Sequence, residues 1–193
     1  PALLRGAARH RGPFGHRLAV RGEDAATLAA RLGAWAGGDA GAAVTGAAAP
    51  GQGVVFAFSG NGAPFAGMAQ AQLAANPDFA RGVAEADAAL APRLGWSARD
   101  RLRDGVTAEA LADSAIAQPL LFAVQHGIVA ALAAAGLRPM LCLGHSVGEV
   151  AAAAAAGLLP LDQAAMLIVA RSRRQAATRG QGRMAALGAA AGA

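Results

Sequence analysis

The pattern of hydrophobic and polar positions sets the first part of the chain apart from the rest. Residues 16–22 alternate between apolar and polar side chains, which predicts a short strand, and apolar residues recur at helical spacing on one face of 23–38. The stretch 37–53 consists largely of Gly, Ala and Pro without periodicity and is interpreted as a linker. The sequence therefore predicts a small α+β module over residues 1–50.

Residues 51–193 follow a second pattern, in which two compact apolar runs are separated by helical segments. The run VVFAF at 54–58 is bounded by glycines and predicts a buried strand, and MLCLG at 140–144 predicts another. Helices are expected from near Phe65 through Asn76, over about 78–91, 97–112, 118–135 with Pro119 in its first turn, 147–156 and 161–175, and RMAALGA at 183–189 is expected to begin a further strand. This order of elements is typical of an α/β fold whose parallel sheet is covered by helices on both faces.

One uncharged segment, residues 115–137, is long enough to cross a bilayer. Much of its apolar character comes from Ala, and Gln118, Gln125 and His126 interrupt it. We interpret it as a buried helix of a cytoplasmic protein that does not enter a membrane. The N-terminus has no continuous apolar core ahead of its arginines, so we expect no signal peptide.

Charge and cysteine content exclude several classes of protein. All 17 basic residues are Arg and the net charge is +5, but the arginines are scattered among acids and form no stripe with aromatic residues. Nucleic-acid binding is therefore not expected. The positive charge suits an anionic substrate instead. The single Cys142 excludes an internal disulfide framework and a cysteine zinc site, so we expect no metal and a reducing compartment.

The most informative motif is Gly144-His145-Ser146-Val147-Gly148, which lies between a predicted strand and a predicted helix. Flanking glycines allow a sharp turn that lifts a serine hydroxyl clear of the sheet and aims the N-terminus of the helix at what it holds. A serine at this position can instead merely cap the helix. Its position between glycines favours a nucleophile for acyl transfer.

Such a nucleophile needs two N–H donors for the oxyanion and a base for its proton. The first donor is predicted to be the amide of Val147. The Gly-rich turn at 59–62, which follows the first strand, is the candidate for the second.

No convincing base is found among the four histidines. His145 is next to the serine, but a residue in that place in an elbow points away from the hydroxyl. His126 lies within the long apolar helix and is interpreted as a structural residue, and His10 and His16 belong to the N-terminal module.

Four segments in a specific order and spacing carry a resemblance to a known family. The chain resembles the acyltransferase domain of modular type I polyketide synthases and, more distantly, malonyl-CoA:ACP transacylases. The segments are FAFSGNGAPFAGMA (56–69), IAQPLLFAVQHGIVAAL (116–132), LGHSVGEVAAAAAAGLL (143–159) and VARSRRQAATRGQGRMAALG (169–188). HRGPFGHRLAV (10–20) is similar to the linker that joins a ketosynthase to the acyltransferase.

The resemblance assigns roles at matching positions. Ser146 would take the acyl group, with Val147 and Asn61 supplying the oxyanion-hole amides. The family usually has Gln where Asn61 stands, which leaves a main-chain donor in place but puts side-chain contacts in doubt. His145 is grouped with the substrate-binding residues.

Two further positions match the family's substrate pocket. Gln118 corresponds to a glutamine near the active site, and Arg171 to the arginine that holds the free carboxylate of the substrate. The planar, permanently charged fork of an arginine suits a carboxylate on physical grounds. An arginine there can also satisfy carbonyls at a helix C-terminus, a role that Arg173 and Arg174 fit better.

The resemblance also implies an incomplete domain and a set of partners. The chain would be the first part of an α/β-hydrolase-like large subdomain after the linker module, with the catalytic histidine beyond Ala193. It would need no cofactor of its own: its substrates are a coenzyme A thioester and an acyl carrier protein with a phosphopantetheine arm. An adjacent ketosynthase, a homodimeric parent synthase and a role in antibiotic biosynthesis are implied as well.

Several functions stay open from the sequence. The hypothesis that leads is transfer of a malonyl-type extender unit, with a lean toward malonyl because a branched apolar residue such as Val147 tends to accompany it in the family. The alternatives are a loading acyltransferase for a monocarboxylate starter unit, a serine esterase of the α/β-hydrolase type, and a noncatalytic interaction remnant.

Overall fold

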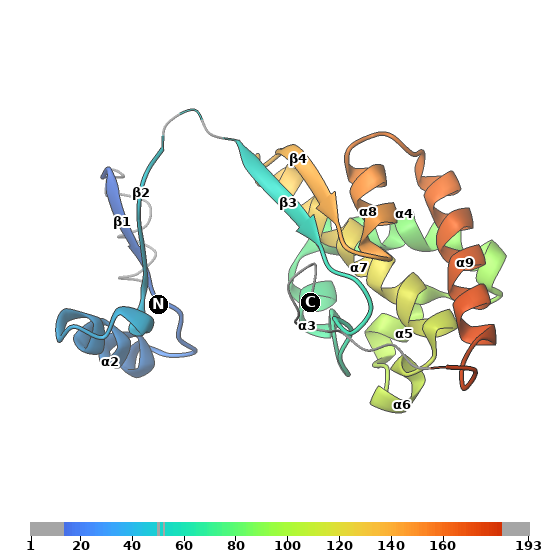
Figure 1. Ribbon diagram of the computed structural model, residues 1–193, viewed down its shortest axis with the longest axis horizontal. Helices are drawn as coiled ribbons and strands as arrows, with labels where there is room; N and C mark the ends of the chain where they lie inside the picture. Colours follow the sequence, from blue (N-terminus) through green and yellow to red (C-terminus); the bar gives the residue numbers. More distant parts are fainter. Residues whose placement is uncertain (1–13, 50, 52, 183–193) are drawn as a thin grey trace, which may run out of the picture. The chain divides into compact units, whose positions relative to one another are not determined.

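The computed structural model describes residues 14–49, 51 and 53–182, and the chain divides into two compact units, Pro1–Gln52 and Gly53–Ala193. The first unit contains β1 (His16–Ala19), α2 (Ala25–Ala36), the short 3₁₀ helix η1 (Ala40–Ala42) and β2 (Val44–Ala47) (Figure 1). The predicted strand and helix are both present. The side chain of Asp24 accepts a hydrogen bond from the amide of Thr27 at 2.7 Å, which caps α2.

The interpretation of 37–53 as a linker is wrong in its middle. Residues Val44–Ala47 form β2, which pairs antiparallel with β1 so that His16 faces Ala47. All four residues of β2 are exposed. Because neither face is buried, the pattern of side chains carries no alternation, and the strand is held by backbone pairing that the sequence does not display.

The second unit contains a two-stranded parallel sheet and seven helices among its described residues. Its elements in order are β3 (Val54–Phe58), α3 (Gln70–Ala75), α4 (Pro77–Leu94), α5 (Ala98–Asp104), α6 (Ala108–Leu111), α7 (Ser114–Ala134), β4 (Pro139–Gly144), α8 (Gly148–Ala155) and α9 (Leu161–Ala177). Strands β3 and β4 pair in parallel with Phe58 opposite Gly144, so their carboxyl ends meet at one edge. Both predicted strands and the α/β class are confirmed.

Several helix boundaries differ from those predicted. The helix expected from Phe65 begins only at Gln70, after Ala69 in a left-handed conformation. The helix expected over 97–112 is broken at Gly105, whose φ of 94° is not helical, into α5 and α6. The segment RMAALGA lies outside the described residues.

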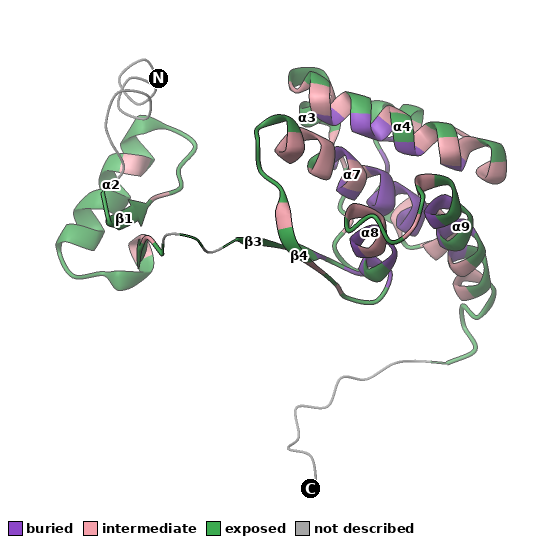
Figure 2. Ribbon diagram, turned by 90° about the horizontal axis from the view of Figure 1, so that it is seen from above, coloured by how far each residue is buried: buried purple, intermediate pink, exposed green. Residues whose placement is uncertain are grey.

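Helix α7 forms the centre of the second unit. It packs against α4, α8 and α9, and the buried residues in Figure 2 gather along it. It begins at Ser114, not near 118, so Pro119 lies inside the helix. Its length and composition would suit a membrane span, but 56% of its most apolar window is buried within the protein. The polar interruptions of this helix therefore lie in or beside a packed core.

One face of the small sheet is not covered by the described residues. Phe58 is buried and Cys142 is partly buried against the core, whereas Val55, Leu141 and Leu143 are 43–54% exposed. In the described part of the chain, helices therefore cover the sheet on one face, and the prediction of cover on both faces is not met there.

Candidate active site

Ser146 lies in a sharp turn at the carboxyl end of β4. Its φ is +55°, a left-handed conformation that a serine rarely adopts, and helix α8 begins two residues later. The amide of His145 donates to the carbonyl of Phe58 at 3.0 Å, and the amide of Glu149 donates to the carbonyl of Ser146 at 3.2 Å. The strand, the turn and the helix thus hold the serine at an exposed position on the edge where β3 and β4 end.

Both flanking glycines are required by close approach of the backbone. A Cβ on Gly144 would overlap the backbone of Glu149, and a Cβ on Gly148 would overlap the carbonyl oxygen of Phe58. Neither obstacle is a flexible side chain. The elbow predicted from the sequence is confirmed, and its tightness explains why both glycines are needed.

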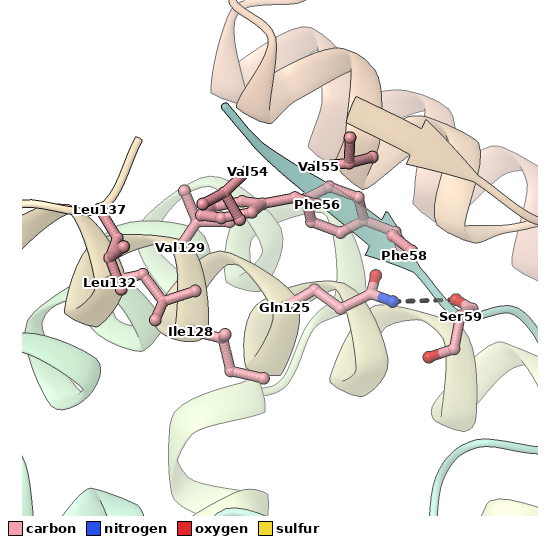
Figure 3. A pocket seen from close by; sticks show the side chains of 11 residues that line it. Val54, Val55, Phe56, Phe58, Ser59, Gln125, Ile128, Val129, Leu132 and Leu137 are labelled. Atoms are coloured by element: carbon pink, nitrogen blue, oxygen red, sulfur yellow. Dashed lines mark hydrogen bonds between the residues drawn. The ribbon is translucent and has the colours of Figure 1, made fainter. Parts of the chain in front are cut away.

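The Gly-rich turn after β3 lies directly against this elbow. Gly60 is buried, and a Cβ on it would lie 2.7 Å from the carbonyl oxygen of His145 and 3.1 Å from Cβ of Ser146. The turn is fixed from below by Gln125, whose side-chain amide donates to the carbonyl of Ser59 at 2.9 Å (Figure 3). Gln125 was not predicted as a site residue, although an amide side chain within an apolar helix was the available signal.

The two amides predicted to form an oxyanion hole carry no hydrogen bond to any described residue. Val147 precedes the first helical residue of α8, and its side chain is buried, so its N–H belongs to the free amide groups of a helix N-terminus. Asn61 is exposed at the tip of the turn. Both N–H groups are available, and their joint action on an oxyanion stays a prediction.

Arg171 on α9 is the described residue whose side chain is hydrogen-bonded to that of Ser146. Its Nη2 donates to Oγ of Ser146 at 2.9 Å, across 25 positions of sequence. Its Nε is buried and has no hydrogen-bond partner among the described residues. Arg173 has a structural role instead, because its guanidinium donates to the carbonyl of Arg93 near the end of α4.

Gln118 is linked to the helix that carries Arg171. It is fully buried on α7, and its Nε2 donates to Oε1 of Gln175 at 2.6 Å. Its own Oε1 has no partner in the described part of the chain. Gln175 stands one helical turn after Arg171, so both side chains leave the same face of α9. Sequence reasoning missed Gln175, because nothing in the string RSRRQ distinguishes it from a surface residue.

No described histidine is hydrogen-bonded to Ser146. His145 is exposed, and its Nδ1 lies beside Gly60. Nε2 of His126 lies 3.3 Å from a carboxylate oxygen of Glu85, and His16 belongs to the first unit. Burial raises the pKa of Glu85, but hydrogen bonds from Arg81 and from His126 outweigh it and leave that pKa below its usual value. His126 is therefore engaged with Glu85 and not with the serine, and His10 lies outside the described residues.

The surroundings of the elbow contain an apolar cavity but no cluster of potential metal ligands among the described residues. The described residues contain no cluster of three or more potential metal ligands. An apolar cavity of about 380 Å³ lies between β3 and α7 (Figure 3), and its lining includes Ser59 and Gln125 but not Ser146. The arrangement thus combines an exposed serine, free amide donors and a cation, and no histidine in the described part of the chain is bonded to that serine.

Comparison with known proteins places these features in a family context. The acyl transferase domain family matches residues 55–192. Polyketide synthase GfsE of Streptomyces halstedii is 37% identical over 183 residues, which are 92% of this chain and 5% of that protein. Erythronolide synthase EryA3 of Saccharopolyspora erythraea is 36% identical over 188 residues, which are 97% of this chain and 6% of that protein.

Solved structures agree with these sequence relatives. The acyltransferase domain from module 8 of the salinomycin polyketide synthase is 37% identical, with a TM-score of 0.73 over 92% of this chain and 43% of that one. A malonyl-transacylase solved in complex with a type II polyketide synthase acyl carrier protein is 28% identical, with a TM-score of 0.55 over 63% of this chain and 38% of its own. The chain thus spans less than half of the length of these acyltransferases.

Proposed function

The chain belongs to the acyl transferase domain family, and we propose that it holds the nucleophile of an acyltransferase that moves a malonyl-type group from coenzyme A to an acyl carrier protein in polyketide biosynthesis. One observation carries the proposal: Ser146 is held at a positive φ between a strand and a helix, with the Arg171 guanidinium 2.9 Å from its Oγ. A serine that merely caps a helix has no need of either feature.

The proposed reaction has two transfers. Oγ of Ser146 attacks the thioester carbonyl, the bond from that carbon to sulfur breaks, and the coenzyme A thiolate leaves and takes up a proton. The thiol of the carrier's phosphopantetheine arm then attacks the serine ester, and Oγ recovers a proton as it leaves. In each step negative charge develops on the carbonyl oxygen, where the amides of Val147 and Asn61 would donate.

The base that moves these protons is proposed to be a histidine outside this chain, as in the family that the sequence resembles. The described histidines support this division, since His126 is paired with Glu85 and His145 is not bonded to the serine. The chain alone would then bind and orient an acyl group but transfer it slowly, because removal of a general base costs about 10²- to 10⁴-fold in rate.

Selectivity is proposed to rest on Arg171. A free carboxylate on the acyl group pairs with a guanidinium through two parallel hydrogen bonds, whereas an acetyl group leaves that cation without an anion. Malonyl is proposed over methylmalonyl on the weaker ground of Val147, whose side chain is buried behind the elbow.

The carrier protein and an adjacent ketosynthase are the proposed partners, in a homodimeric cytoplasmic synthase. The malonyl-transacylase neighbour is itself solved with a carrier protein.

The test uses the complete domain that contains this chain. Incubation with malonyl-coenzyme A, followed by intact-mass measurement, is expected to add one malonyl group, and Ser146→Ala is expected to remove the adduct. A matched control is Ser172→Ala, because Ser172 is buried on α9 and bonded to the carbonyl of Val169, not to the site. An unchanged adduct in Ser146→Ala would refute the assignment.

Competition among acyl donors separates the remaining functions. Malonyl-coenzyme A is expected to exceed acetyl-coenzyme A in forming the ester, and Arg171→Ala is expected to abolish that preference. If acetyl is preferred in the parent, a loading role for a monocarboxylate starter replaces the proposal. Rapid hydrolysis of neutral esters would identify an esterase, and absence of any adduct would identify a noncatalytic remnant.

A further inference from the structure

The cation proposed to bind the substrate is bonded to the nucleophile itself. Nη2 of Arg171 donates to Oγ of Ser146 at 2.9 Å, and no other described side chain is hydrogen-bonded to this oxygen. A serine attacks through a lone pair on Oγ, and a productive carbonyl carbon must come within about 3–3.5 Å of that atom. The guanidinium nitrogen therefore engages one lone pair and occupies space beside the atom that has to react.

The same guanidinium has a second donor, Nε, that is not hydrogen-bonded to any described residue. Nε of Arg171 is buried and has no hydrogen-bond partner among the described residues. The N–H of Nε and one N–H of Nη2 lie along one edge of the planar group, spaced to meet the two oxygens of a carboxylate. Among the described residues, Nη2 is bonded to the serine hydroxyl and Nε has no partner.

We propose that Arg171 restrains the nucleophile in the empty site, and that a free carboxylate releases Ser146 by taking the Nε–Nη2 edge of the guanidinium. The inference rests on the proposed function and adds a second source of selectivity to it. An acyl group with a carboxylate would both fill the clamp and free the serine. An acetyl group would meet a serine still bonded to the arginine.

The direction of the exchange follows from the strengths of the two contacts. A hydrogen bond from the charged guanidinium to a neutral hydroxyl is already stronger than a neutral one, but a carboxylate adds its own negative charge and accepts two such bonds from one arginine edge. The serine hydroxyl is neutral and accepts a single bond. Binding of a carboxylate also satisfies the buried Nε, which the hydroxyl does not reach.

The opposite effect of the same contact is also physically possible. A permanent cation beside a hydroxyl favours its ionised form, so that Arg171 would activate the serine and its withdrawal would slow the reaction. The two accounts predict changes of opposite sign when a carboxylate binds. The sign is therefore the quantity to measure.

The experiment follows the reaction of Ser146 with methanesulfonyl fluoride, a small neutral reagent. Oγ forms a bond to sulfur, fluoride leaves, and the hydroxyl proton is lost to the solvent, so intact mass reports one added group. The complete domain is labelled at rising concentrations of formate, the smallest carboxylate, which competes for the guanidinium without filling an acyl pocket. Formamide, of similar size but neutral, and sodium chloride are the controls.

Formate is expected to raise the labelling rate to a plateau about tenfold above the basal rate, which corresponds to the loss of one hydrogen bond to a charged group. Formamide and chloride are expected to leave the rate unchanged. Arg171→Ala is expected to label fast without formate and to ignore it. Arg173→Ala, on the same helix but bonded to Arg93, is expected to respond as the parent does.

A labelling rate that falls with formate, or does not change, overturns the proposal on the unmodified protein, whether or not Arg171→Ala folds. The result is also separable from that for the proposed function. A malonyl ester at Ser146 without any effect of formate refutes only the restraint, and acceleration by formate without a malonyl ester refutes only the acyl transfer.

Discussion

The two units of the chain contain the same kinds of elements but are stabilised in different ways. In the first, β1, β2 and α2 are joined by backbone pairing and by an aspartate cap, and none of its described residues is buried. In the second, buried side chains from α4, α7, α8 and α9 form one continuous cluster. In the first unit, distant residues meet through backbone pairing alone, whereas packing in the second unit brings the side chains of Arg171 and Ser146 together.

The difference shows that local signals can begin and end helices, whereas a packed core is needed to position distant side chains. Caps and turns are enough to begin and end helices in both units. Positioning a cation within hydrogen-bond distance of a nucleophile 25 residues away requires helices that cannot shift, and close packing provides that rigidity. Substitutions of the same kind should therefore have unlike effects in the two units.

The largest contrast is expected from Gly→Ala substitutions. Gly148→Ala puts a methyl group into the carbonyl oxygen of Phe58, and we expect it to lower the free energy of unfolding of the second unit by about 3 kcal/mol. Gly33→Ala on α2 meets nothing within 4 Å, and it should stabilise its helix by about 0.5–1 kcal/mol.

Each unit contains one tryptophan, so the two effects can be measured separately. Denaturant unfolding of Trp35→Phe reports the second unit through Trp96, and that of Trp96→Phe reports the first unit through Trp35. An unchanged midpoint for Gly148→Ala would show that the elbow can relax, against the close approach described for it.

A smaller contrast is expected from Leu→Ala substitutions. Leu120 on α7 is fully buried, and Leu120→Ala should lower the free energy of unfolding by about 3 kcal/mol, as is typical of buried leucines. Leu32 on α2 is 43% exposed, and its truncation should cost less than about 1 kcal/mol. The same pair of tryptophan reporters applies. Equal losses at the two positions would mean that Leu32 is buried by contacts outside the described residues.

The smallest effect is expected from the pH dependence of the α2 cap. The hydrogen bond from the backbone amide of Thr27 lowers the pKa of Asp24 below its ordinary value of 3.8. A carboxylate whose pKa is lower in the folded state than in the unfolded state stabilises the folded state at pH values above the unfolded-state pKa. The helix should therefore weaken as the pH falls from 3.8 through the lowered pKa of Asp24. The NMR shift of the Thr27 amide measures this change.

Asp24→Asn is the matched control for the cap, because asparagine caps a helix equally well but does not titrate. Its Thr27 amide shift should stay constant over the same pH range. A transition that persists in Asp24→Asn would assign the pH dependence to another group.

The sequence predicted the second unit better than the first. Both parallel strands, the elbow at Ser146 and most helices follow from patterns that a core imposes, since burial of one face produces periodicity. Strand β2 was missed because its side chains are exposed on both sides. The break at Gly105 and the late start at Gln70 follow from positive φ angles at Gly105 and Ala69, which the pattern of apolar residues does not show.

The candidate site was predicted in part for similar reasons. Ser146, Val147 and Asn61 lie in Gly-rich turns whose spacing is visible, and the structure brings both turns together through Gly60. Gln125 and Gln175 were missed because their roles depend on partners 66 and 57 positions away. The bond between Arg171 and Ser146 could not be predicted either, because it depends on how α9 packs against the elbow.

At Ser146, the positive φ lowers the stability of the fold, whereas the proposed acyl transfer requires the serine hydroxyl. A left-handed conformation costs a residue with a Cβ about 1 kcal/mol, and glycine avoids that cost. Selection for thermostability alone would therefore favour Ser146→Gly, which removes the hydroxyl. A population of variants screened only for folding should lose the proposed nucleophile early, and one screened for acyl transfer should keep Ser146 and gather its stabilising substitutions elsewhere.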